Sequence, residues 1–428
     1  ALNGRNGDLL WQVPSRNQIV GSAIFKDITG DGIEDVFIGG RSAQLFAING
    51  KTGKVVWEYL STHEEMDLQN DTTLLNFYNP QFVHDMDHDG LEDVLIAFGG
   101  YVKAPPEETN RPVGSIMILS SASGKLIGKA PVPDGKETYC SPLLLDGEAG
   151  KKGLFIFGTG GETINGGLYL GKLNDVVKGD LGSALKLADG QGKGFMAPPI
   201  LVDITGDGIQ DIVANSFKGV MHAFNGSTYE HIWQYRAQEG LETYTSLAPI
   251  DVNQDGIMDF FSTYGRGAWP KINKGIQVVV DGKSGMEIFR DSVGALQFSS
   301  PLVGDFNKDG HSDVLLSTNR PTYVSNGPET EVFLSPTVTE TYVFDFTNEQ
   351  AHLWKKTAKG VNLSSTPLLC DLDGNGRLDM ITTKMTNAMG YFSMKGLTVE
   401  RTEPNISVSN ITWGQYMGPD YNGQYVTD

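Results

Sequence analysis

Residues 85–100 read DMDHDGLEDVLIAFGG. Aspartates stand at the first, third, fifth and ninth positions of this stretch, and a glycine stands at the sixth. An apolar run follows directly, of the length that is typical of a buried strand. Carboxylates at this density indicate either a site for a hard cation or a hairpin held by side-chain hydrogen bonds.

The acidic stretch recurs along the chain. Further copies begin at Asp27, Asp203, Asp251, Asp305 and Asp371, and a degenerate seventh copy, DGEAGKKGL, begins at Asp146. Most copies follow one short apolar run and precede another, so we expect each to connect two strands. A unit that repeats about every 50 to 60 residues is the signature of a repeat architecture.

A second element repeats out of phase with the first. An Asn or Asp turn stands eight residues before an aromatic residue in LFAINGKTGKVVW, MHAFNGSTYEHIW and VVVDGKSGMEIF, and residues 1–11 fit the same template. Asn-Gly and Asp-Gly between apolar runs predict hairpins. Trp11, Trp57, Trp233 and Trp354 are therefore expected to occupy one structural position, on the outer strand of each unit.

The two elements together predict an all-β fold, a β-propeller of four-stranded blades that forms a single domain over residues 1–428. Because the chain enters with the third and fourth strands of a blade, we expect both termini to build one composite closing blade, from residues 1–13 and about 405–428. Eight blades are favoured, and seven is the alternative.

The acidic loops predict calcium binding. Oxygen ligands at positions 1, 3, 5 and 9, with the backbone carbonyl of position 7, suit Ca²⁺, and glycine at position 6 permits the turn around the ion. The expected ligand residues are Asp27, Thr29, Asp31, Ile33 and Asp35; Asp85, Asp87, Asp89, Leu91 and Asp93; Asp203, Thr205, Asp207, Ile209 and Asp211; Asp251, Asn253, Asp255, Ile257 and Asp259; Asp305, Asn307, Asp309, His311 and Asp313; and Asp371, Asp373, Asn375, Arg377 and Asp379. The six loops together predict about six bound calcium ions.

Two other interpretations of these loops were weighed. An EF-hand is excluded, because position 12 is not acidic and the flanking segments are strands. A metal-free hairpin is the alternative, although unpaired carboxylates this close would repel one another. The Asp85 loop, with four acids, is expected to bind most tightly, and the Asp27 and Asp203 loops, with Thr at position 3, to release first. The Asp146 loop, with Lys151, Lys152 and Leu154, is expected to bind no ion.

The loops carry a family resemblance. Their D-x-[DN]-x-D-G-x-x-D pattern resembles the FG-GAP (VCBS-type) repeats of integrin-α-like propellers, and the NGKTGKVVW element resembles blades of quinoprotein-like propellers. The resemblance implies a propeller with calcium in its loops and with ligands on the face away from the calcium. It is a poor guide to function, because one fold hosts many functions.

Long insertions fall on the connections between strands 2 and 3 and between consecutive blades, opposite the acidic loops. Loops of this kind carry binding residues. The expected partner-binding residues are those of hot-spot type, namely Tyr101, Arg111, Tyr264, Arg266, Trp269, Lys271, Arg320 and Tyr323. The alternative is that these loops only pack against one another.

Composition narrows the function. A formal charge of −19 argues against nucleic acid and anionic membranes, and no apolar stretch spans a membrane. Two cysteines, Cys140 and Cys370, exclude a disulfide scaffold or zinc site and are expected to be buried thiols. Sequons at Asn70, Asn225, Asn362, Asn405 and Asn410 agree with a glycoprotein that is secreted, on the cell surface or periplasmic, its leader removed.

The predicted function is a calcium-stabilised binding or adhesion module for a protein or glycan, within a larger assembly. A propeller-type polysaccharide lyase or hydrolase is the alternative. A quinoprotein dehydrogenase is disfavoured, because the vicinal cysteine pair found in many of those enzymes is absent. The glycine-rich segment 158–167 is expected to be a hairpin rather than a phosphate-binding loop, because no Lys-Ser/Thr follows it.

Overall fold

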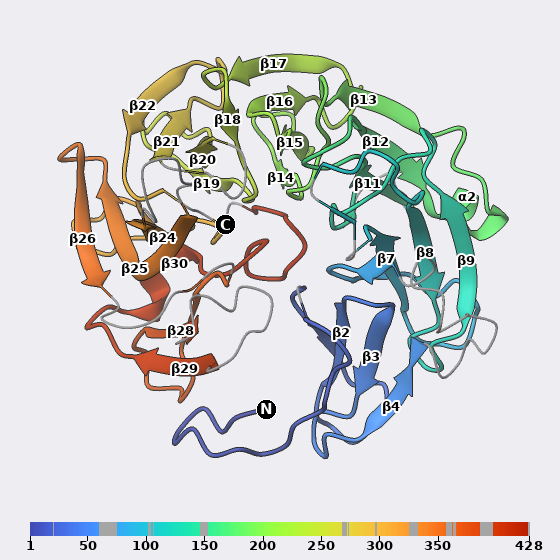
Figure 1. Ribbon diagram of the computed structural model, residues 1–428. Coiled ribbons are helices and arrows are strands. Elements are labelled where there is room, and N and C mark those ends of the chain that lie inside the picture. Colours follow the sequence, from blue (N-terminus) through green and yellow to red (C-terminus); the bar gives the residue numbers. More distant parts are fainter. Residues whose placement is uncertain are drawn as a thin grey trace. The chain divides into compact units, whose positions relative to one another are not determined.

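The computed structural model describes residues 1–19, 21–59, 75–101, 104–105, 107–145, 153–267, 272, 274–295, 298–324, 333–356, 362, 365–385 and 397–426. The chain forms two compact units, Ala1–Pro198 and Pro199–Asp428, and each is described by itself. Both are built almost entirely from antiparallel sheets, shown in Figure 1.

The first unit contains three sheets. Their strands are β1 (Ile24–Lys26), β2 (Asp35–Gly40), β3 (Gln44–Ile48) and β4 (Val55–Glu58); β5 (Asn76–Phe77), β6 (Gln81–Val83), β7 (Asp93–Gly99), β8 (Ser115–Leu119) and β9 (Leu126–Pro131); and β10 (Leu143–Leu144), β11 (Leu154–Gly158), β12 (Gly167–Lys172) and β13 (Leu185–Asp189). Neighbouring strands pair in chain order, except that β5 and β6 both pair with β7. A short helix, α2 (Leu173–Lys178), follows β12.

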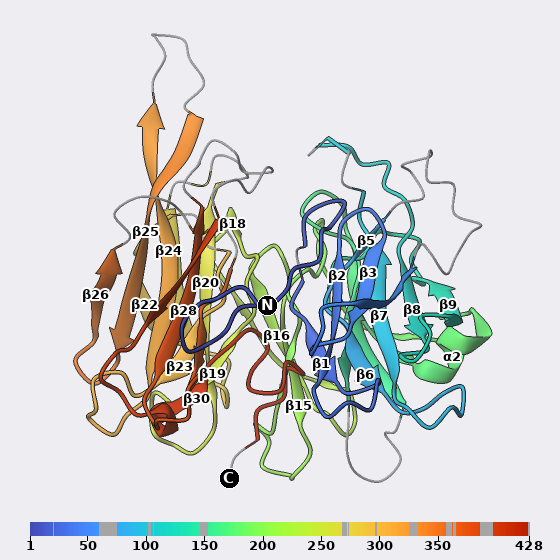
Figure 2. The same cartoon turned by 90° about the horizontal axis from the view of Figure 1, so that it is seen from below.

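The second unit contains four sheets. Their strands are β14 (Ile200–Val202), β15 (Asp211–Asn215), β16 (Val220–Phe224) and β17 (His231–Arg236); β18 (Leu241–Glu242), β19 (Ala248–Ile250), β20 (Asp259–Arg266), β21 (Lys274–Val280) and β22 (Glu287–Asp291); β23 (Leu302–Gly304), β24 (Asp313–Val324), β25 (Phe333–Asp345), β26 (Gln350–Lys356) and β30 (Ile411–Trp413); and β27 (Leu368–Cys370), β28 (Asp379–Met385) and β29 (Leu397–Thr402). In Figure 2 the hairpin of β24 and β25 extends beyond the other strands of this unit. A 3-10 turn, Val408–Asn410, precedes β30.

The second and third strands are largely buried in every blade except that of β27, β28 and β29, where β29 has no buried residue. Every residue of β3, β7, β8, β15 and β16 is buried, whereas outer strands such as β4 and β17 alternate between exposed and buried positions. Continuous apolar runs suit strands covered on both faces, and alternation suits strands with one face in water. Each core therefore lies between neighbouring sheets of one unit.

Three of the four repeated tryptophans make the same contact with the hairpin turn of the next blade. The indole Nε1 of Trp11 donates to the Gly50 carbonyl at 2.8 Å, that of Trp57 to Ser121 at 2.7 Å and that of Trp233 to Gly282 at 2.7 Å. Trp354, on β26, instead packs against the Phe306 ring, with centroids 5.5 Å apart. The shared outer position is thus confirmed for Trp57 and Trp233, while Trp11 makes the contact from outside any strand.

These sheets make the chain an all-β β-propeller with four-stranded blades, as the sequence predicts, but the described residues form seven blades, so the favoured number of eight is wrong. The composite closing blade does not form. Residues 1–13 contribute only an isolated bridge between Leu2 and Leu9, and β30 joins an existing blade beside β23.

The C-terminal segment pairs with the free inner edges of blades in its own unit. Val303 of β23 lies opposite Trp413, the Leu369 N–H of β27 donates to the Gly414 carbonyl, and Leu201 of β14 exchanges backbone hydrogen bonds with Gly423 and Tyr425. Unpaired edge groups of a sheet need such partners when water is excluded. This demand is the physical reason that the segment adds to three blades instead of starting an eighth.

No helix among the described residues has the length and apolar character needed to cross a membrane.

Candidate functional site

The acidic loops lie where the sequence predicts, between the first and second strands of their blades. They join β1 to β2, β6 to β7, β14 to β15, β19 to β20, β23 to β24 and β27 to β28. The degenerate loop at Asp146 lies outside the described residues, so the expectation that it binds no ion remains a prediction.

Each acidic loop is wound around the carboxylate of its first aspartate. In the Asp85 loop, Oδ1 accepts from the His88 N–H at 2.6 Å and Oδ2 from the Gly90 N–H at 2.9 Å. Hydrogen bonds from the loop backbone, that of Gly90 foremost, hold the pKa of Asp85 below its usual range. The position 6 glycine has a positive φ in all six loops: 82° at Gly32, 95° at Gly90, 80° at Gly208, 84° at Gly256, 87° at Gly310 and 79° at Gly376. The predicted turn geometry is therefore confirmed.

The Asp85 loop has the donor set that fits a hard cation best. Carboxylate oxygens of Asp85, Asp87 and Asp89 lie within 4.8 Å of one another. Asp93 is fully buried, and its Oδ1 has no hydrogen-bond partner among the described residues. Burial, with the charges of the three neighbouring aspartates, raises the pKa of Asp93 to about 6. A buried, unsatisfied carboxylate oxygen beside three further carboxylates is the environment that a bound Ca²⁺ would stabilise.

The ninth-position aspartates also have a structural role that the sequence analysis missed. Asp35 Oδ2 accepts from the Ile28 and Thr29 N–H groups, and its Oδ1 accepts from the Gly50 N–H at 3.0 Å. Asp211 and Asp259 accept in the same way from Gly226 at 2.8 Å and from Gly282 at 3.0 Å. These carboxylates fasten the acidic loop to the hairpin turn between strands 3 and 4. The signal for this contact is an Asn-Gly or Asp-Gly whose glycine follows the ninth-position aspartate by 15, 15 and 23 residues in these three blades.

Loops with Thr or Asn at position 3 hold part of their donor set by side-chain amides. Asn49 Nδ2 donates to Thr29 Oγ1 and to Asp31 Oδ2, both at 2.9 Å. Asn253 Nδ2 donates to Asp281 Oδ2 at 2.7 Å, and Asn307 Nδ2 to Asp309 Oδ2 at 3.0 Å. Oxygen donors remain at positions 1, 5 and 9 of these loops. They therefore offer a cation fewer carboxylate charges than the Asp85 loop does.

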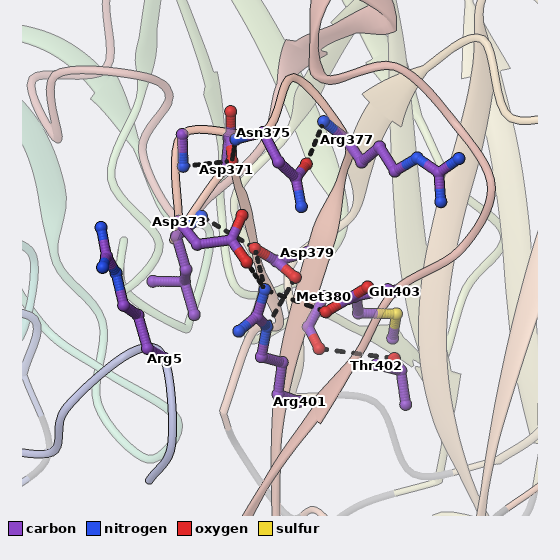
Figure 3. A network of polar contacts seen from close by, with 12 residues as sticks. Arg5, Asp371, Asp373, Asn375, Arg377, Asp379, Met380, Arg401, Thr402 and Glu403 are labelled. Carbon is purple, nitrogen blue, oxygen red and sulfur yellow. Dashed lines mark hydrogen bonds and ion pairs between the residues drawn. The ribbon is translucent and has the colours of Figure 1, made fainter.

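The Asp371 loop differs from the others, because an arginine reaches its acids (Figure 3). Arg401 Nε lies 2.7 Å from Asp379 Oδ1, and one terminal nitrogen lies 2.8 Å from Asp373 Oδ2. The same nitrogen lies 3.1 Å from Asp379 Oδ2. The carboxylates of Asp371, Asp373 and Asp379 are within 4.8 Å of one another, and a single guanidinium is paired with two of them. The expectation that this loop binds calcium remains a prediction.

The expected partner-binding residues differ in burial, and some of them lie outside the described residues. Tyr264 is fully buried and its hydroxyl donates to Asn215 Oδ1 at 3.2 Å, so the expectation that it lies on the partner surface is wrong for this conformation. Only 5% of the Arg111 side chain is exposed, and its Nε donates to the Glu108 carbonyl at 2.6 Å. Tyr101 and Arg266 are half-buried. Trp269 and Lys271 lie outside the described residues, and Arg320 and Tyr323 lie on β24 with their side chains outside the description.

Half-buried aromatic residues at the same blade ends were missed by the sequence analysis. Tyr78, Tyr139, Tyr244 and Phe298 each stand just before the first strand of a blade. In the first unit the rings of Tyr78 and Tyr139 have centroids 5.6 Å apart, and in the second unit those of Tyr244 and Phe298 lie 4.5 Å apart. An aromatic residue two to five positions before a proline, as in YNP, YCSP, YTSLAP and FSSP, is the repeated signal that could have found them. We call these four rings the aromatic steps.

A buried acid supports the aromatic steps of the first unit. Glu137 is fully buried, its Oε2 accepts from the Tyr139 hydroxyl at 2.8 Å, and Arg111 Nε lies 3.9 Å from the same oxygen. Burial raises the pKa of the Glu137 carboxyl. Its Oε1 has no hydrogen-bond partner in the described part of the chain. This hydrogen bond fixes the orientation of the Tyr139 ring and places a carboxyl of raised pKa beside its hydroxyl.

Cysteines and sequons agree only in part with expectation. Cys140 is a buried free thiol, and Cys370 is a half-buried one. Asn362 is 7% exposed and its amide donates to the Ser365 carbonyl at 2.6 Å, so this sequon is closed to modification in the folded chain. Asn405 is exposed, Asn225 and Asn410 are half-buried, and Asn70 lies outside the described residues.

Comparisons with known proteins agree with this architecture. Residues 1–152 match the family model described as FAM234A/B beta-propeller, and residues 203–262 match the FG-GAP-like repeat. No curated protein sequence matches the chain significantly.

Several solved structures share the fold at low sequence identity. BamB from Moraxella catarrhalis is 14% identical with a TM-score of 0.50, and the match covers 94% of this chain and 90% of that one. Quinohemoprotein alcohol dehydrogenase from Comamonas testosteroni is 11% identical with a TM-score of 0.57, covering 90% and 67%. A europium-containing methanol dehydrogenase is 12% identical with a TM-score of 0.53, covering 82% and 72%. At these identities the likeness concerns the fold alone. The chain is a β-propeller that carries FG-GAP-like repeats, with blades similar to those of quinoprotein dehydrogenases and BamB.

Proposed function

We propose that this chain is a calcium-stabilised binding module that recognises a protein or glycan outside the cytosol through its long connections. The single observation that carries the proposal is the Asp85 loop, where three carboxylates lie within 4.8 Å of one another and the buried Asp93 Oδ1 lacks a partner. Asp85, Asp87, Asp89 and Asp93 would hold the ion, together with the carbonyl of Leu91. A bound calcium neutralises the repulsion among these groups and fastens the first two strands of the blade.

The partner surface is proposed for the opposite ends of the blades. Acidic loops and hairpin turns share one end of each antiparallel blade, so the connections between strands 2 and 3 and between blades share the other. The aromatic steps, with Tyr101 and Arg266, supply half-buried rings and a cation there. Aromatic residues and arginine dominate the energetics of binding surfaces. This placement leaves the calcium in a stabilising role, away from the partner.

A location outside the cytosol follows from the same chemistry. Calcium sites of modest charge have dissociation constants in the range of about 10⁻⁴ to 10⁻³ M in extracellular modules, far above cytosolic calcium levels. Exposed Asn405 in a sequon agrees with such a location. The acidic balance, −19 in formal charge, agrees with a calcium-rich environment.

A printed glycan array probed with the calcium-loaded chain tests the binding function. We expect retained glycans, loss of signal on Tyr244→Ala and little change on Tyr229→Ala, a half-buried tyrosine in the hairpin turn at the other end of a blade. Co-purification of a protein partner that is lost on Tyr244→Ala is the equivalent outcome for a protein ligand. Equal behaviour of the two variants against every probe would contradict the proposed surface.

A carbohydrate-active enzyme is the second candidate, and Glu137 is the observation that favours it. Burial raises the pKa of Glu137, and a raised pKa is what an acid catalyst needs. Release of reducing or unsaturated ends from polysaccharides, abolished by Glu137→Gln with the fold retained, would establish this candidate over the binding module.

A further inference from the structure

We propose that the Asp371 loop carries its own cation, the guanidinium of Arg401, and that it binds no calcium in the folded chain. The inference rests on the proposed calcium binding of the other acidic loops. It changes the expected number of ions in the loops that the structure describes from six to five, and it identifies which loop is the exception.

The contacts of Arg401 are those of a charge-assisted clamp. Nε lies 2.7 Å from Asp379 Oδ1 and a terminal nitrogen lies 2.8 Å from Asp373 Oδ2. The same terminal nitrogen is 3.0 Å from Glu403 Oε1. Asp379 is 1% exposed, so its charge needs a partner inside the fold. The planar fork of an arginine satisfies two carboxylates at once, which a lysine does not.

Arg401 differs in character from the residues at the same strand position of the other blades. In the register of strands 2 and 3, Arg401 lies opposite Ile381. The equivalent residues of the other loop-bearing blades are all apolar and buried: Ala47, Ile118, Ala223, Val279 and Val343. The position is buried and apolar in those blades, whereas the Arg401 side chain is 23% exposed and its charge is paired with the loop acids.

Two further departures occur in the same blade. Position 5 of the loop is Asn375, whereas every other acidic loop has an aspartate there. Glu403 follows β29, where the corresponding residues are Asn49, Ser120, Asn225, Asp281 and Asp345 in other blades. Asp281 and Asp345 are acids as well, but Asp281 accepts from the Asn253 amide of its own loop, whereas Glu403 pairs with Arg401. The loop has therefore lost one ligand charge, and its turn has gained a group that holds the guanidinium.

The positions of the acids explain why the Arg401 guanidinium and a calcium ion exclude each other in this loop. A calcium ion bound to Asp373 and Asp379 would face the guanidinium at contact distance, and the two cations would repel each other. Asp373 Oδ1 has no hydrogen-bond partner among the described residues, so one oxygen stays available if the arginine is removed. Removal of the guanidinium alone should therefore convert this loop into a calcium site.

Counting bound calcium on the full chain tests the inference. Chelator-treated wild type, Arg401→Met and Asp373→Asn are dialysed against calcium, and bound ions are measured per chain. We expect Arg401→Met to bind one ion more than wild type, and Asp373→Asn to bind the same number as wild type. Arg290→Met is the matched control, since Arg290 pairs with Glu287 at 2.6 Å on the outer strand β22 and no acid of an acidic loop is among its partners in the described part of the chain, and it should leave the count unchanged.

The outcomes separate the two proposals. An equal count in Arg401→Met and wild type, or the loss of one ion in Asp373→Asn, would overturn the role of Arg401 whatever the total. A wild type without any bound calcium would instead refute the calcium function. Stability in calcium-free buffer gives an independent readout: Arg401→Met should lower Tm by about 5 °C more than Arg290→Met, because it leaves the buried Asp379 unpaired. Equal Tm values for the two variants would contradict the clamp.

Discussion

At the residue scale, the chemistry of this chain is decided by which partner each buried or clustered carboxylate finds. Asp93, Asp35 and Asp379 occupy the same loop position. Asp93 has one oxygen without a hydrogen-bond partner among the described residues, Asp35 holds a backbone turn and Asp379 binds Arg401. The loop pattern in the sequence predicts the position of these acids but not the partner, because the partner comes from strand 3 or from the turn after it. Similar motifs can therefore differ in the group that contacts their acids.

Asp87 offers a direct test of the Asp85 loop. Asp87→Asn removes one carboxylate charge and should weaken calcium binding at this loop by at least about tenfold, because affinity depends on the ligand charge count. Isothermal titration of the chelator-treated chain measures the effect. Asp180→Asn is the matched control, since Asp180 and Asp87 each accept a backbone N–H two residues later, at 2.7 and 3.2 Å. Equal affinities for both variants would refute the assignment.

His222 predicts a pH dependence that is independent of calcium. Burial, with the positive charges of His231 and Arg236, lowers the pKa of His222 from 6.5 to about 4. The unfolded chain therefore binds a proton below pH 6.5 that the folded chain refuses until about pH 4, so stability falls as the pH drops through this window. Between pH 7.5 and pH 5 the loss is about 2 kcal/mol.

Urea unfolding of His222→Gln measures this contribution. The variant should lose about 2 kcal/mol less than wild type between pH 7.5 and pH 5. His352→Gln, at an exposed position of the same unit, should keep the wild-type dependence. The same pH dependence in wild type and His222→Gln would show that His222 is not held neutral by the fold.

At the scale of the element, the blade is fastened by contacts between acidic loop, hairpin turn and outer tryptophan. The sequence predicts the strands on either side of each loop and the repeated tryptophans, because short apolar runs and Asn-Gly turns are local signals. It does not predict that Trp57 and Trp233 donate to the turn of the next blade, because that contact joins residues 64 and 49 positions apart. The aromatic steps were missed for the same reason: their pairing is between blades.

Gly285 tests the contact between the tryptophan and the turn. An added Cβ would lie 2.8 Å from the Trp233 ring, and the residue has a φ of +71°. Gly285→Ala should therefore cost about 2 kcal/mol more than Gly240→Ala, whose φ is +78° but whose Cβ would meet nothing within 4 Å. Chemical unfolding of both variants separates overpacking from backbone strain. Equal costs would mean that the turn yields without loss of packing.

At the scale of the whole molecule, the sequence predicts an all-β propeller but not the number of its blades. The first eleven residues resemble the last two strands of a blade, with a turn followed by Trp11, and the C-terminal segment resembles an inner strand. Together they predict a composite closing blade. The structure uses that segment otherwise, because β14, β23 and β27 present free inner edges whose backbone groups it can satisfy. The periodicity of a segment does not predict which strand edge, far away in the sequence, that segment will pair with.

Truncation tests the role of the C-terminal segment. Deletion of residues 406–428 removes Trp413 and Met417, both 1% exposed, and the partners of three strand edges. We expect Tm to fall by at least about 3–6 °C, because a buried tryptophan alone accounts for about 3–5 kcal/mol and the entropy of unfolding of a chain this long is about 0.9 kcal/mol/K. A chain that ends at Tyr425 keeps these contacts and should melt like wild type. Equal melting of the two truncated chains would mean that the segment is only an appendage.

Anomalous diffraction from crystals grown with calcium tests whether the acidic loops bind the ion. We expect an anomalous peak in the Asp85 loop, with Asp85, Asp87, Asp89 and Asp93 as ligands, and no peak in the Asp371 loop, where Arg401 lies. Absence of a peak in the Asp85 loop at millimolar calcium would refute calcium binding by these loops.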